Sequence, residues 1–362
     1  MKPFFSIVIP CCNVAAYIED CLTSIKKQAF TNWECLPIIE DSKDDTEKLI
    51  HTLTEGDERF RIFRQPKSGS AAKPRNTGVD NAQGEYIIFL DGDDSLAGDA
   101  LSKLAKRMEE RPGADMYACT IMEYEDGGRL IRSIDNFQQD APAELTGHDA
   151  ILLIYKHWIN PSPMVQEDIW RRDFLNEHNL RFVPGLQHDD HEFFPRALYR
   201  AARVVPIHVP FYFYRRQSES ITMKKREPGH FLKYMCIVLK SLFSFYVTVS
   251  KEPGFDNRIA ECWAREWIAW LFGWFYEWNV SRIPREKRRE TLDILFADGF
   301  DDLNALARHA SFLRRVAVWW IKLFVKHPSC SKASELFFKW YFRLAEIRNK
   351  NTERQLHEHG DE

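Results

Sequence analysis

The chain has 362 residues, 44% of them hydrophobic, and a formal net charge of −3. This length suggests two domains, or one large domain with an appendage, and the hydrophobic content is sufficient for a sizeable core. The nearly neutral charge gives no global indication of nucleic-acid binding, so no nucleic-acid partner is expected.

The eight cysteines show no CxxC pair and no metal-ligand spacing. Several lie inside apolar runs, so we expect reduced core thiols in a cytoplasmic protein. Residues 4–10 enter an apolar strand directly, without the pattern of a signal peptide. No apolar run reaches the roughly 18 residues that a membrane-spanning helix needs.

Strands and helices alternate in the first third of the chain. The periodicity predicts strands at residues 5–9, 33–39, 61–63, 86–90 and 116–123. Helices are predicted at residues 17–28, about 44–54, from about 74, and at 100–111. Asp44 and Glu47 have the approximate spacing of a capping box, and Asp44 is interpreted as a helix cap. Strands separated by helices indicate an α/β fold with a mostly parallel central sheet.

The pattern changes twice further along the chain. Helices are predicted at residues 146–156 and 172–179, and strands at 204–209 and 211–214 flank Pro210. Beyond about residue 229, long helical segments rich in Trp, Phe, Lys and Arg follow. We therefore place a boundary near residue 228, which divides an α/β domain (1–228) from an α-helical C-terminal region (229–362).

Polar side chains follow three of the predicted strands at the point where each strand ends. Pro10 and Asn13 follow the first, Asp41 follows the second, and the segment Asp91-Gly92-Asp93-Asp94 follows the strand at 86–90. The carboxyl ends of parallel strands meet at one edge of a sheet, so these residues should line one crevice. One carboxylate can hydrogen-bond a base or ribose, and another can hold Mg²⁺ or Mn²⁺ on a diphosphate. A solvated Asp-Gly turn is the alternative.

Arg75 lies near the start of a predicted helix and can add positive charge facing the same anion. The chain contains neither a GxxxxGK[ST] loop nor a GxGxxG fingerprint. A nucleotide would therefore have to be held through carboxylate and metal rather than through a glycine-rich phosphate loop.

Seven short segments carry a further signal. The opening FSIVIPCCN resembles the motif "SIIIPVYN", and FLDGDD at residues 89–94 closely resembles "FLDSDD". The segments lie, in order and at compatible spacing, at residues 5–13, 17–25, 39–45, 69–78, 89–94, 179–196 and 212–222. Together they resemble a family 2 glycosyltransferase with a GT-A fold, a Rossmann-like fold of nucleotide-diphospho-sugar transferases, over residues 4–222.

The resemblance implies a donor site built from the strand ends. Asp41 would contact the uracil of a UDP-sugar, in a pocket shaped by Pro10 and Asn13. Asp91 would contact ribose or sugar, and Asp93 would hold Mn²⁺ or Mg²⁺ on the diphosphate. Ser42-Lys43 and Cys11-Cys12 depart from the family pattern, which leaves open which nucleobase the site selects.

The resemblance also implies the chemistry. Asp190 would be the general base, taking a proton from an acceptor hydroxyl as its oxygen attacks the anomeric carbon with inversion. Asp189 stands where the family has Glu, so either carboxylate can be the base, and the register favours Asp190. Arg75 would offset charge on the departing UDP, although Lys73-Pro74 allows a slip of one position. Arg215 either lies over the diphosphate or belongs to a surface pair with Arg216.

The C-terminal region carries a second signal. Residues 311–350 contain nine basic and two acidic residues, interleaved with aromatics. Such helices can bind peripherally to an anionic membrane, here at the inner face of the cytoplasmic membrane. The alternative is a helical subdomain with a solvated basic face.

The sequence therefore predicts an inverting glycosyltransferase that moves a sugar from a UDP-sugar to a glycan or lipid-linked acceptor in bacterial surface-polysaccharide assembly. Two other functions remain open. One is a catalytically weak nucleotide-sugar-binding protein, and the other is a membrane or partner scaffold built on residues 229–350.

Overall fold

The computed structural model describes residues 2–125, 128–137, 141–157, 164–216, 230–280, 285–296 and 301–326. The chain divides into two compact units, Met1–Lys225 and Arg226–Glu362. The boundary predicted near residue 228 lies outside the described residues, as do the motif residues 220–222 and Cys330.

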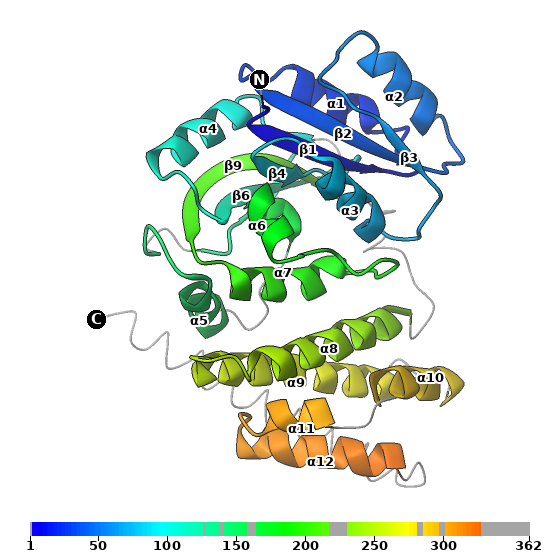
Figure 1. Cartoon of the computed structure of the whole chain (residues 1–362). Helices are drawn as coiled ribbons and strands as arrows, with labels where there is room; N and C mark the ends of the chain where they lie inside the picture. The colour runs from blue at the N-terminus through cyan, green and yellow to red at the C-terminus, as the bar shows by residue number, and fades with distance from the viewer. Residues whose placement is uncertain are drawn as a thin grey trace. The chain divides into compact units, whose positions relative to one another are not determined.

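The first unit is an α/β structure (Figure 1). Its strands are β1 (Phe5–Cys11), β2 (Trp33–Glu40), β3 (Phe63–Gln65), β4 (Tyr86–Phe89), β5 (Ser95–Leu96), β6 (Met116–Glu125), β7 (Leu130–Ile134), β8 (Asp168–Arg171) and β9 (Val204–Arg216). Its helices are α1 (Ile18–Lys26), α2 (Thr46–Thr54), α3 (Ala72–Asn81), α4 (Ala100–Glu110), α5 (Gly147–His157), α6 (Arg172–Glu177) and α7 (Asp189–Arg200). The α/β class predicted from the sequence is confirmed.

The strands form one sheet in the order β3-β2-β1-β4-β8-β6-β9-β5, with β7 paired to β6. Strands β3, β2, β1 and β4 are mutually parallel, as predicted, and β6 is parallel to β9. Strand β8 lies between these two groups and runs antiparallel to both β4 and β6. It was not predicted from the sequence, and it brings residues 164–168 to the sheet edge where β4 ends.

Alternating residues of β1 pack against different layers. Ile7 and Ile9 face a core shared with α1 and α4, whereas Val8 faces α3 on the other side of the sheet. A Cβ placed on Gly78 of α3 would lie 2.1 Å from Cγ1 of Val8, so only glycine permits this close approach. The helix that carries Arg75 is therefore held tightly against the strand that precedes Asn13.

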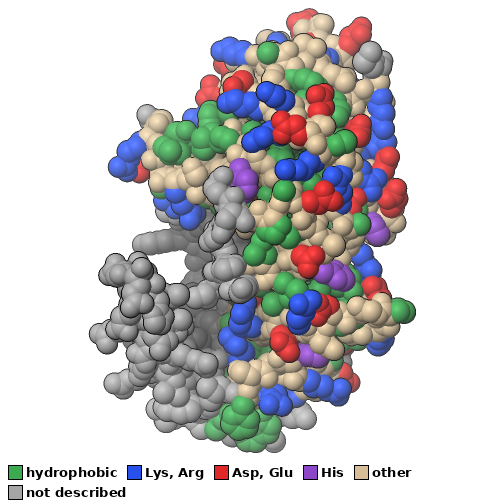
Figure 2. Space-filling view, turned by 90° about the vertical axis from the view of Figure 1, so that its left-hand side faces the viewer, with side chains coloured by type: hydrophobic (Ala, Val, Ile, Leu, Met, Phe, Trp, Pro, Cys, Tyr) green, Lys and Arg blue, Asp and Glu red, His purple; other side chains and the backbone are tan. Residues whose placement is uncertain are grey.

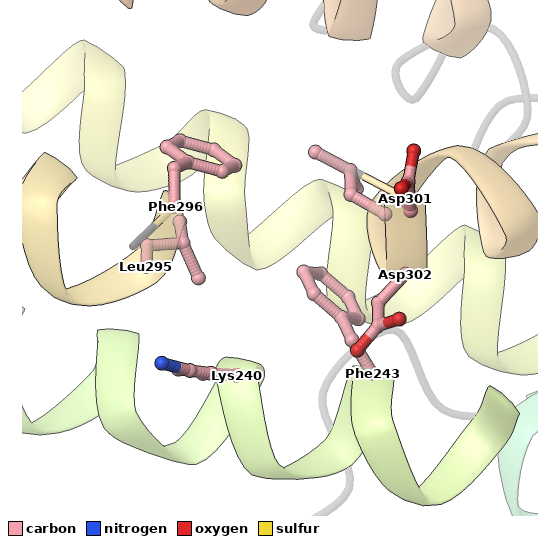
Figure 3. A pocket seen from close by; sticks show the side chains of 7 residues that line it. Lys240, Phe243, Leu295, Phe296, Asp301 and Asp302 are labelled. Atoms are coloured by element: carbon pink, nitrogen blue, oxygen red, sulfur yellow. The ribbon is translucent and has the colours of Figure 1, made fainter. Parts of the chain in front are cut away.

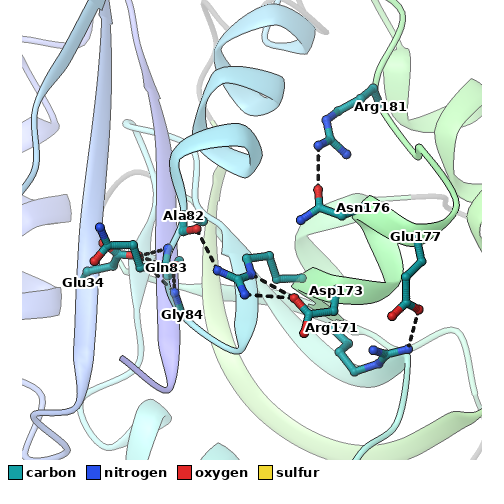
Figure 4. A network of polar contacts seen from close by, with 11 residues as sticks. Glu34, Ala82, Gln83, Gly84, Arg171, Asp173, Asn176, Glu177 and Arg181 are labelled. Carbon is teal, nitrogen blue, oxygen red and sulfur yellow. Dashed lines mark hydrogen bonds and ion pairs between the residues drawn. The ribbon is translucent and has the colours of Figure 1, made fainter. Parts of the chain in front are cut away.

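A buried carboxylate fixes the turn that leads into β4. Glu34 accepts hydrogen bonds from the hydroxyl of Ser6 (2.6 Å) and from the amides of Gln83 (2.5 Å) and Gly84 (3.1 Å). Figure 4 shows the contacts of Glu34 with Gln83 and Gly84, and separately the ion pair of Arg171 with Glu177. Three donors and an ion pair with Arg61 at 2.6 Å make this buried charge tolerable and set the register of β4.

Three details differ from the sequence predictions. The third strand begins at Phe63 rather than ending there. The two strands expected around Pro210 are one strand, β9, with register shifts against β6 that accommodate the missing amide hydrogen. Asp44 does not make a capping box. Its carboxylate accepts from the amide and hydroxyl of Thr46 and from the amide of Ala15 (3.0 Å), and so joins the loops after β1 and β2.

The described part of the second unit contains helices α8 (His230–Val249), α9 (Asn257–Val280), α10 (Arg285–Phe296), α11 (Asp301–Ala307) and α12 (Phe312–Lys326). Trp263 and Trp267 stack in its core at 4.8 Å. A cavity of about 60 Å³ lies between α8, α10 and α11, beside Lys240, Phe243 and Asp302 (Figure 3). This is far smaller than the few hundred Å³ of a typical ligand pocket, so it cannot hold a nucleotide sugar.

Cys11, Cys21, Cys35, Cys119 and Cys236 are buried free thiols, as expected, whereas Cys12 and Cys262 are free thiols that are only partly buried. No helix formed by the described residues combines the length and the apolar character needed to cross a membrane.

Two carboxylates are buried where β8 begins. Glu167 and Asp168 are each 1% exposed. The amide of Asn136 donates to one oxygen of Glu167 at 2.5 Å, but neither carboxylate oxygen of Asp168 has a hydrogen-bond partner in the described structure. Burial, followed by the nearby charge of Asp135, raises the pKa of Asp168 well above its usual range.

Replacing Asp168 by asparagine should therefore stabilise the protein at pH 8. Between pH 4 and the raised pKa, the folded chain holds a proton that the unfolded chain has lost, so stability falls as the pH rises. The substitution removes this loss, with a gain of about 1 to 3 kcal/mol at pH 8 and none near pH 4. Urea denaturation at both pH values measures the difference. Asp99→Asn, at an exposed position, is the matched control. A loss of stability at pH 8 would contradict the prediction.

Candidate active site

The loops after β1, β2 and β4 meet at the carboxyl ends of these strands. Asn13 adopts the left-handed conformation (φ +56°), and its side chain accepts from the amide of Lys43 at 2.8 Å. Its own amide donates to the hydroxyl of Ser42 at 3.1 Å. A Cβ built on Gly92 would lie 3.2 Å from the carbonyl oxygen of Pro10. The strand-end residues predicted to converge therefore lie together.

Asp41 lies at the exposed rim of this region. Its carboxylate makes long contacts of 3.4 Å with the guanidinium of Arg64 and with the amide of Lys67. The thiol of Cys12 lies 3.8 Å from its carbonyl oxygen. Because both partners of the carboxylate are exposed and distant, Asp41 can exchange them for a ligand at low cost.

The carboxylates after β4 have different surroundings. Asp94 is buried and accepts from the hydroxyl of Tyr212 (2.6 Å) and the amide of Arg215 (2.7 Å). Burial and the neighbouring Asp93 and Asp91 raise the pKa of Asp94. Asp94 therefore supports the loop, whereas Asp91 and Asp93 are partly exposed.

Arg75 joins the two sides of the site. Its side chain is 5% exposed, and one terminal nitrogen donates to Asp91 at 3.0 Å. The other donates to both carboxylate oxygens of Asp189 at 3.1 Å. The guanidinium also lies 5.5 Å from the ring of Phe182. Arg75 thus bridges the carboxylate after β4 and the first residue of α7, and both charges it contacts belong to the protein.

The start of α7 is held in place from α3. Asn76, the next residue after Arg75, makes two 2.8 Å hydrogen bonds with the backbone of Phe182. The ring of Phe182 stacks on Phe193 of α7 at 4.1 Å. These contacts fix the segment that precedes α7, so the geometry of Asp189 and Asp190 depends on α3.

Asp189 and Asp190 have different partners at the N-terminus of α7. Asp189 is buried and engaged by Arg75, whereas Asp190 is a partly buried residue whose carboxylate accepts from the amide of His191 at 2.9 Å. Burial raises the pKa of both carboxyls above the ordinary aspartate range, although the charge of Arg75 opposes the shift. Burial also lowers the pKa of His191 to about 4, so this imidazole is neutral at physiological pH.

Arg215 lies at the same loop rather than on the surface with Arg216. Its backbone amide donates to Asp94, its Nε lies 3.3 Å from the carbonyl oxygen of Asp93, and its terminal nitrogen contacts Asp20 at 3.0 Å. Arg216 instead pairs with Glu123 at 3.0 Å. Arg215 is therefore the member of the pair that is near the predicted diphosphate site.

Two residues of this region were not identified from the sequence. The amide nitrogen of Gln166 donates to Asp91 at 2.7 Å, and the hydroxyl of Tyr212 accepts from the amide of Asp91 at 3.1 Å while donating to Asp94. Gln166 lies in no motif, and its position follows from the unpredicted strand β8. Tyr212 belongs to a matched segment, but nothing in the sequence indicates which carboxylate it contacts.

The described residues could bind a metal ion only if a bound donor molecule supplied some of the coordinating atoms. No group of three His, Cys, Asp or Glu side chains among the described residues is arranged to hold a metal ion. Asp94 is engaged by Tyr212, and Asp91 by Arg75 and Gln166. Asp93, which is partly exposed, can supply one oxygen to Mg²⁺ or Mn²⁺ if diphosphate oxygens and water supply the others.

Comparisons with known proteins find similarity to glycosyltransferases. Residues 6–174 match the family model "Glycosyl transferase family 2". Glycosyltransferase GlyG of Streptococcus pneumoniae is 26% identical over 224 residues, 61% of this chain and 73% of that protein. The GalNAc(5)-diNAcBac-PP-undecaprenol beta-1,3-glucosyltransferase of Campylobacter jejuni is 29% identical over 152 residues, 41% of this chain and 48% of that enzyme. The chain thus covers less than half of the Campylobacter protein.

The fold also matches a solved structure. The crystal structure of S. aureus TarS 1-349 with UDP-GlcNAc has a TM-score of 0.64 and 19% identity, and the match covers 93% of this chain and 89% of that one. Together with the aspartates at the strand ends, this likeness defines the GT-A class of fold, as the motifs predicted. Residues 6–174 thus match glycosyltransferase family 2, and together with its named relatives this match marks the protein as a glycosyltransferase.

Proposed function

We propose that the enzyme moves a sugar from a UDP-sugar to a hydroxyl group of a glycan or lipid-linked acceptor in bacterial surface-polysaccharide assembly, with inversion at the anomeric carbon. The observation that supports this best is the buried Asp91–Arg75–Asp189 bridge. It holds a carboxylate of the strand-end loops next to the start of α7, where Asp190 lies. The names of the Streptococcus and Campylobacter relatives and the UDP-GlcNAc complex of the TarS structure agree with such a reaction.

The donor would lie across the strand ends. Asp41 would accept hydrogen bonds from the uracil, beside Pro10 and Asn13, because its present partners are exposed and easily displaced. Arg75 and Gln166 each donate a hydrogen bond to Asp91. Asp91 is still partly exposed, and in this position it would accept hydrogen bonds from ribose or sugar hydroxyls. The diphosphate would then lie near Asp93 and Arg215.

Asp93 would hold Mn²⁺ or Mg²⁺ together with the diphosphate. When bound, such an ion supplies positive charge to the departing UDP. Arg215 adds a cation from the protein on the same side. Arg75 contributes by orienting Asp91 rather than by binding phosphate, since both of its terminal nitrogens are bonded to carboxylates.

Asp190 would act as the general base. The acceptor O–H bond breaks, and its proton passes to the Asp190 carboxylate. The acceptor oxygen forms a bond to the anomeric carbon, while the bond from that carbon to the phosphate oxygen breaks and its electron pair leaves with UDP. Asp189 is the weaker candidate because both of its oxygens are bonded to Arg75. Asp190 instead accepts from the backbone amide of His191, which leaves it better placed to take up a proton.

A thermal-shift screen of UDP- and GDP-sugars, each with and without Mn²⁺, tests the donor. A bound UDP-sugar at 100 times its Kd should stabilise the fold by about 2.7 kcal/mol. We expect Asp93→Asn to lose the Mn²⁺-dependent part of this stabilisation. Asp99→Asn should keep it, because Asp99 is an exposed residue that directly precedes α4. No stabilisation by any nucleotide sugar would refute the donor. Stabilisation without transfer to any acceptor would favour a nucleotide-sugar-binding protein.

A further inference from the structure

Helix α12 presents two different faces. Ala317, Val318 and Ile321 are buried within the second unit. On the opposite face, Phe312 is 70% exposed and Trp319 is 57% exposed. Large hydrophobic side chains are seldom left this accessible to water without a function, and two of them on one helix form a patch rather than a scatter.

Three exposed residues of α12 and the partly buried Val316 form one continuous surface. Phe312, Arg315, Val316 and Trp319 follow the spacing i, i+3, i+4, i+7, which places them in one row on a helix. The same four residues line an open groove of about 330 Å³. In the view of Figure 2, hydrophobic side chains gather at the bottom with Lys and Arg side chains close by, and α12 is drawn at the bottom of the view in Figure 1. We refer to these four residues as the aromatic–basic face.

The charge of the helix is of one sign. Residues Phe312–Lys326 include two arginines and two lysines and no acidic residue. Arg315 is exposed between the two aromatic positions, and Arg308 is exposed shortly before the helix begins. Exposed aromatics interleaved with bases are the composition of helices that lie in the interface of a membrane with anionic lipids.

We propose that the aromatic–basic face docks into the interface of an anionic membrane. Phe312, Val316 and Trp319 would enter the headgroup region, and Arg315 would pair with lipid phosphates. This binding requires no catalysis, so it can fail or succeed independently of the proposed reaction.

Charge complementarity favours lipid over a second copy of the chain. A two-fold contact between copies would place the same basic face against itself, and the arginines would repel each other. An anionic surface meets the same arginines with opposite charge. A contact between copies is nevertheless a distinct outcome that the experiment can detect.

Flotation of the full-length protein with vesicles tests the proposal. We expect binding to vesicles of phosphatidylcholine with phosphatidylglycerol, and much weaker binding to phosphatidylcholine alone. The double variant Phe312→Ser/Trp319→Ser should lose most of the binding. Arg315→Glu should weaken it at least about fivefold, because each basic residue near an anionic surface contributes roughly that factor.

Two matched controls exclude general effects of surface change. Leu130→Ser removes an exposed hydrophobic residue of the first unit, and Lys251→Glu reverses an exposed charge of the second unit that does not belong to α12. Both should bind vesicles like the parent protein, and circular dichroism should show that every variant is folded. Equal flotation of the double variant, or no flotation of the parent protein, would overturn the proposal. So would a change from dimer to monomer in the double variant on sedimentation, which would assign the face to a second copy.

Discussion

Replacing Asp190 by asparagine should reduce sugar transfer by about 10² to 10⁴-fold, the usual contribution of a positioned general base. The amide has the size of the carboxylate but cannot take the proton of the acceptor hydroxyl. Donor binding should remain, since Asp190 is not among the residues assigned to the donor. Initial rates with a UDP-sugar and a glycan acceptor, beside a thermal-shift titration with UDP, measure both properties.

Asp189→Asn is the matched comparison for this prediction. Both oxygens of Asp189 are bonded to Arg75, so we expect this variant to lose stability while keeping more activity than Asp190→Asn. If Asp189→Asn instead abolishes transfer in a stable protein and Asp190→Asn does not, the base is Asp189.

The pH profile of transfer provides a second measure of the same assignment. A general base acts only when deprotonated, and burial raises the pKa of both Asp189 and Asp190. Activity should therefore fall on the acid side at a pH higher than about 4, the ordinary value for aspartate. Because the two carboxyls interact, the pH at which activity falls reports an apparent pKa of the pair rather than that of one residue. In Asp190→Asn the residual rate should no longer show this fall in activity on the acid side.

Replacing Arg75 by methionine should have the largest effect on stability, about 3 to 5 kcal/mol, because it leaves Asp189 buried and Asp91 partly buried without their counter-charge. Transfer should fall as well, since Asp91 and the start of α7 lose their common partner. Arg75→Lys should recover only part of the stability, because an ammonium group cannot make both sets of bonds. Urea denaturation at pH 5 and pH 8 measures these differences.

The pH dependence distinguishes a lost ion pair from lost packing. Without Arg75, the pKa of Asp189 should rise further, since the guanidinium charge lowers it in the parent protein. The penalty should then be smaller at pH 5, where Asp189 takes up a proton, than at pH 8. Adding Asp189→Asn to Arg75→Met should restore part of the stability. Arg64→Met, at an exposed pair with Asp41, should cost no more than about 1 kcal/mol. An equal penalty at both pH values would point to packing alone.

Much of the donor side could be predicted because its signals are local. The strands at 5–9, 33–39 and 86–90 are short apolar runs that end in polar residues, and their parallel pairing follows from the helices between them. The carboxyl ends of such strands meet wherever the sheet forms, so Asn13, Asp41 and the segment after β4 are brought together by topology alone.

Other features depended on contacts between distant parts of the chain. Strand β8 contains Asp168 and follows no clear alternation, so its place between β4 and β6 could not be read from local pattern. Gln166 therefore reaches Asp91 across 75 residues without any sequence signal. The hydrogen bond from the amide of Ala15 to Asp44 also had no sequence signal, because Ala15 lies on another loop.

The family resemblance, the α/β class and the carboxylates at the strand ends can be read from the amino-acid sequence, because they depend on local periodicity and on motifs that stand in order. The pairing of the charges follows only from the folded structure. Arg75 and Asp189 are 114 residues apart, and their contact exists because Gly78 lets α3 approach β1 while Asn76 holds the segment before α7. A side chain's partner is set by packing across the whole fold, and no local pattern records it.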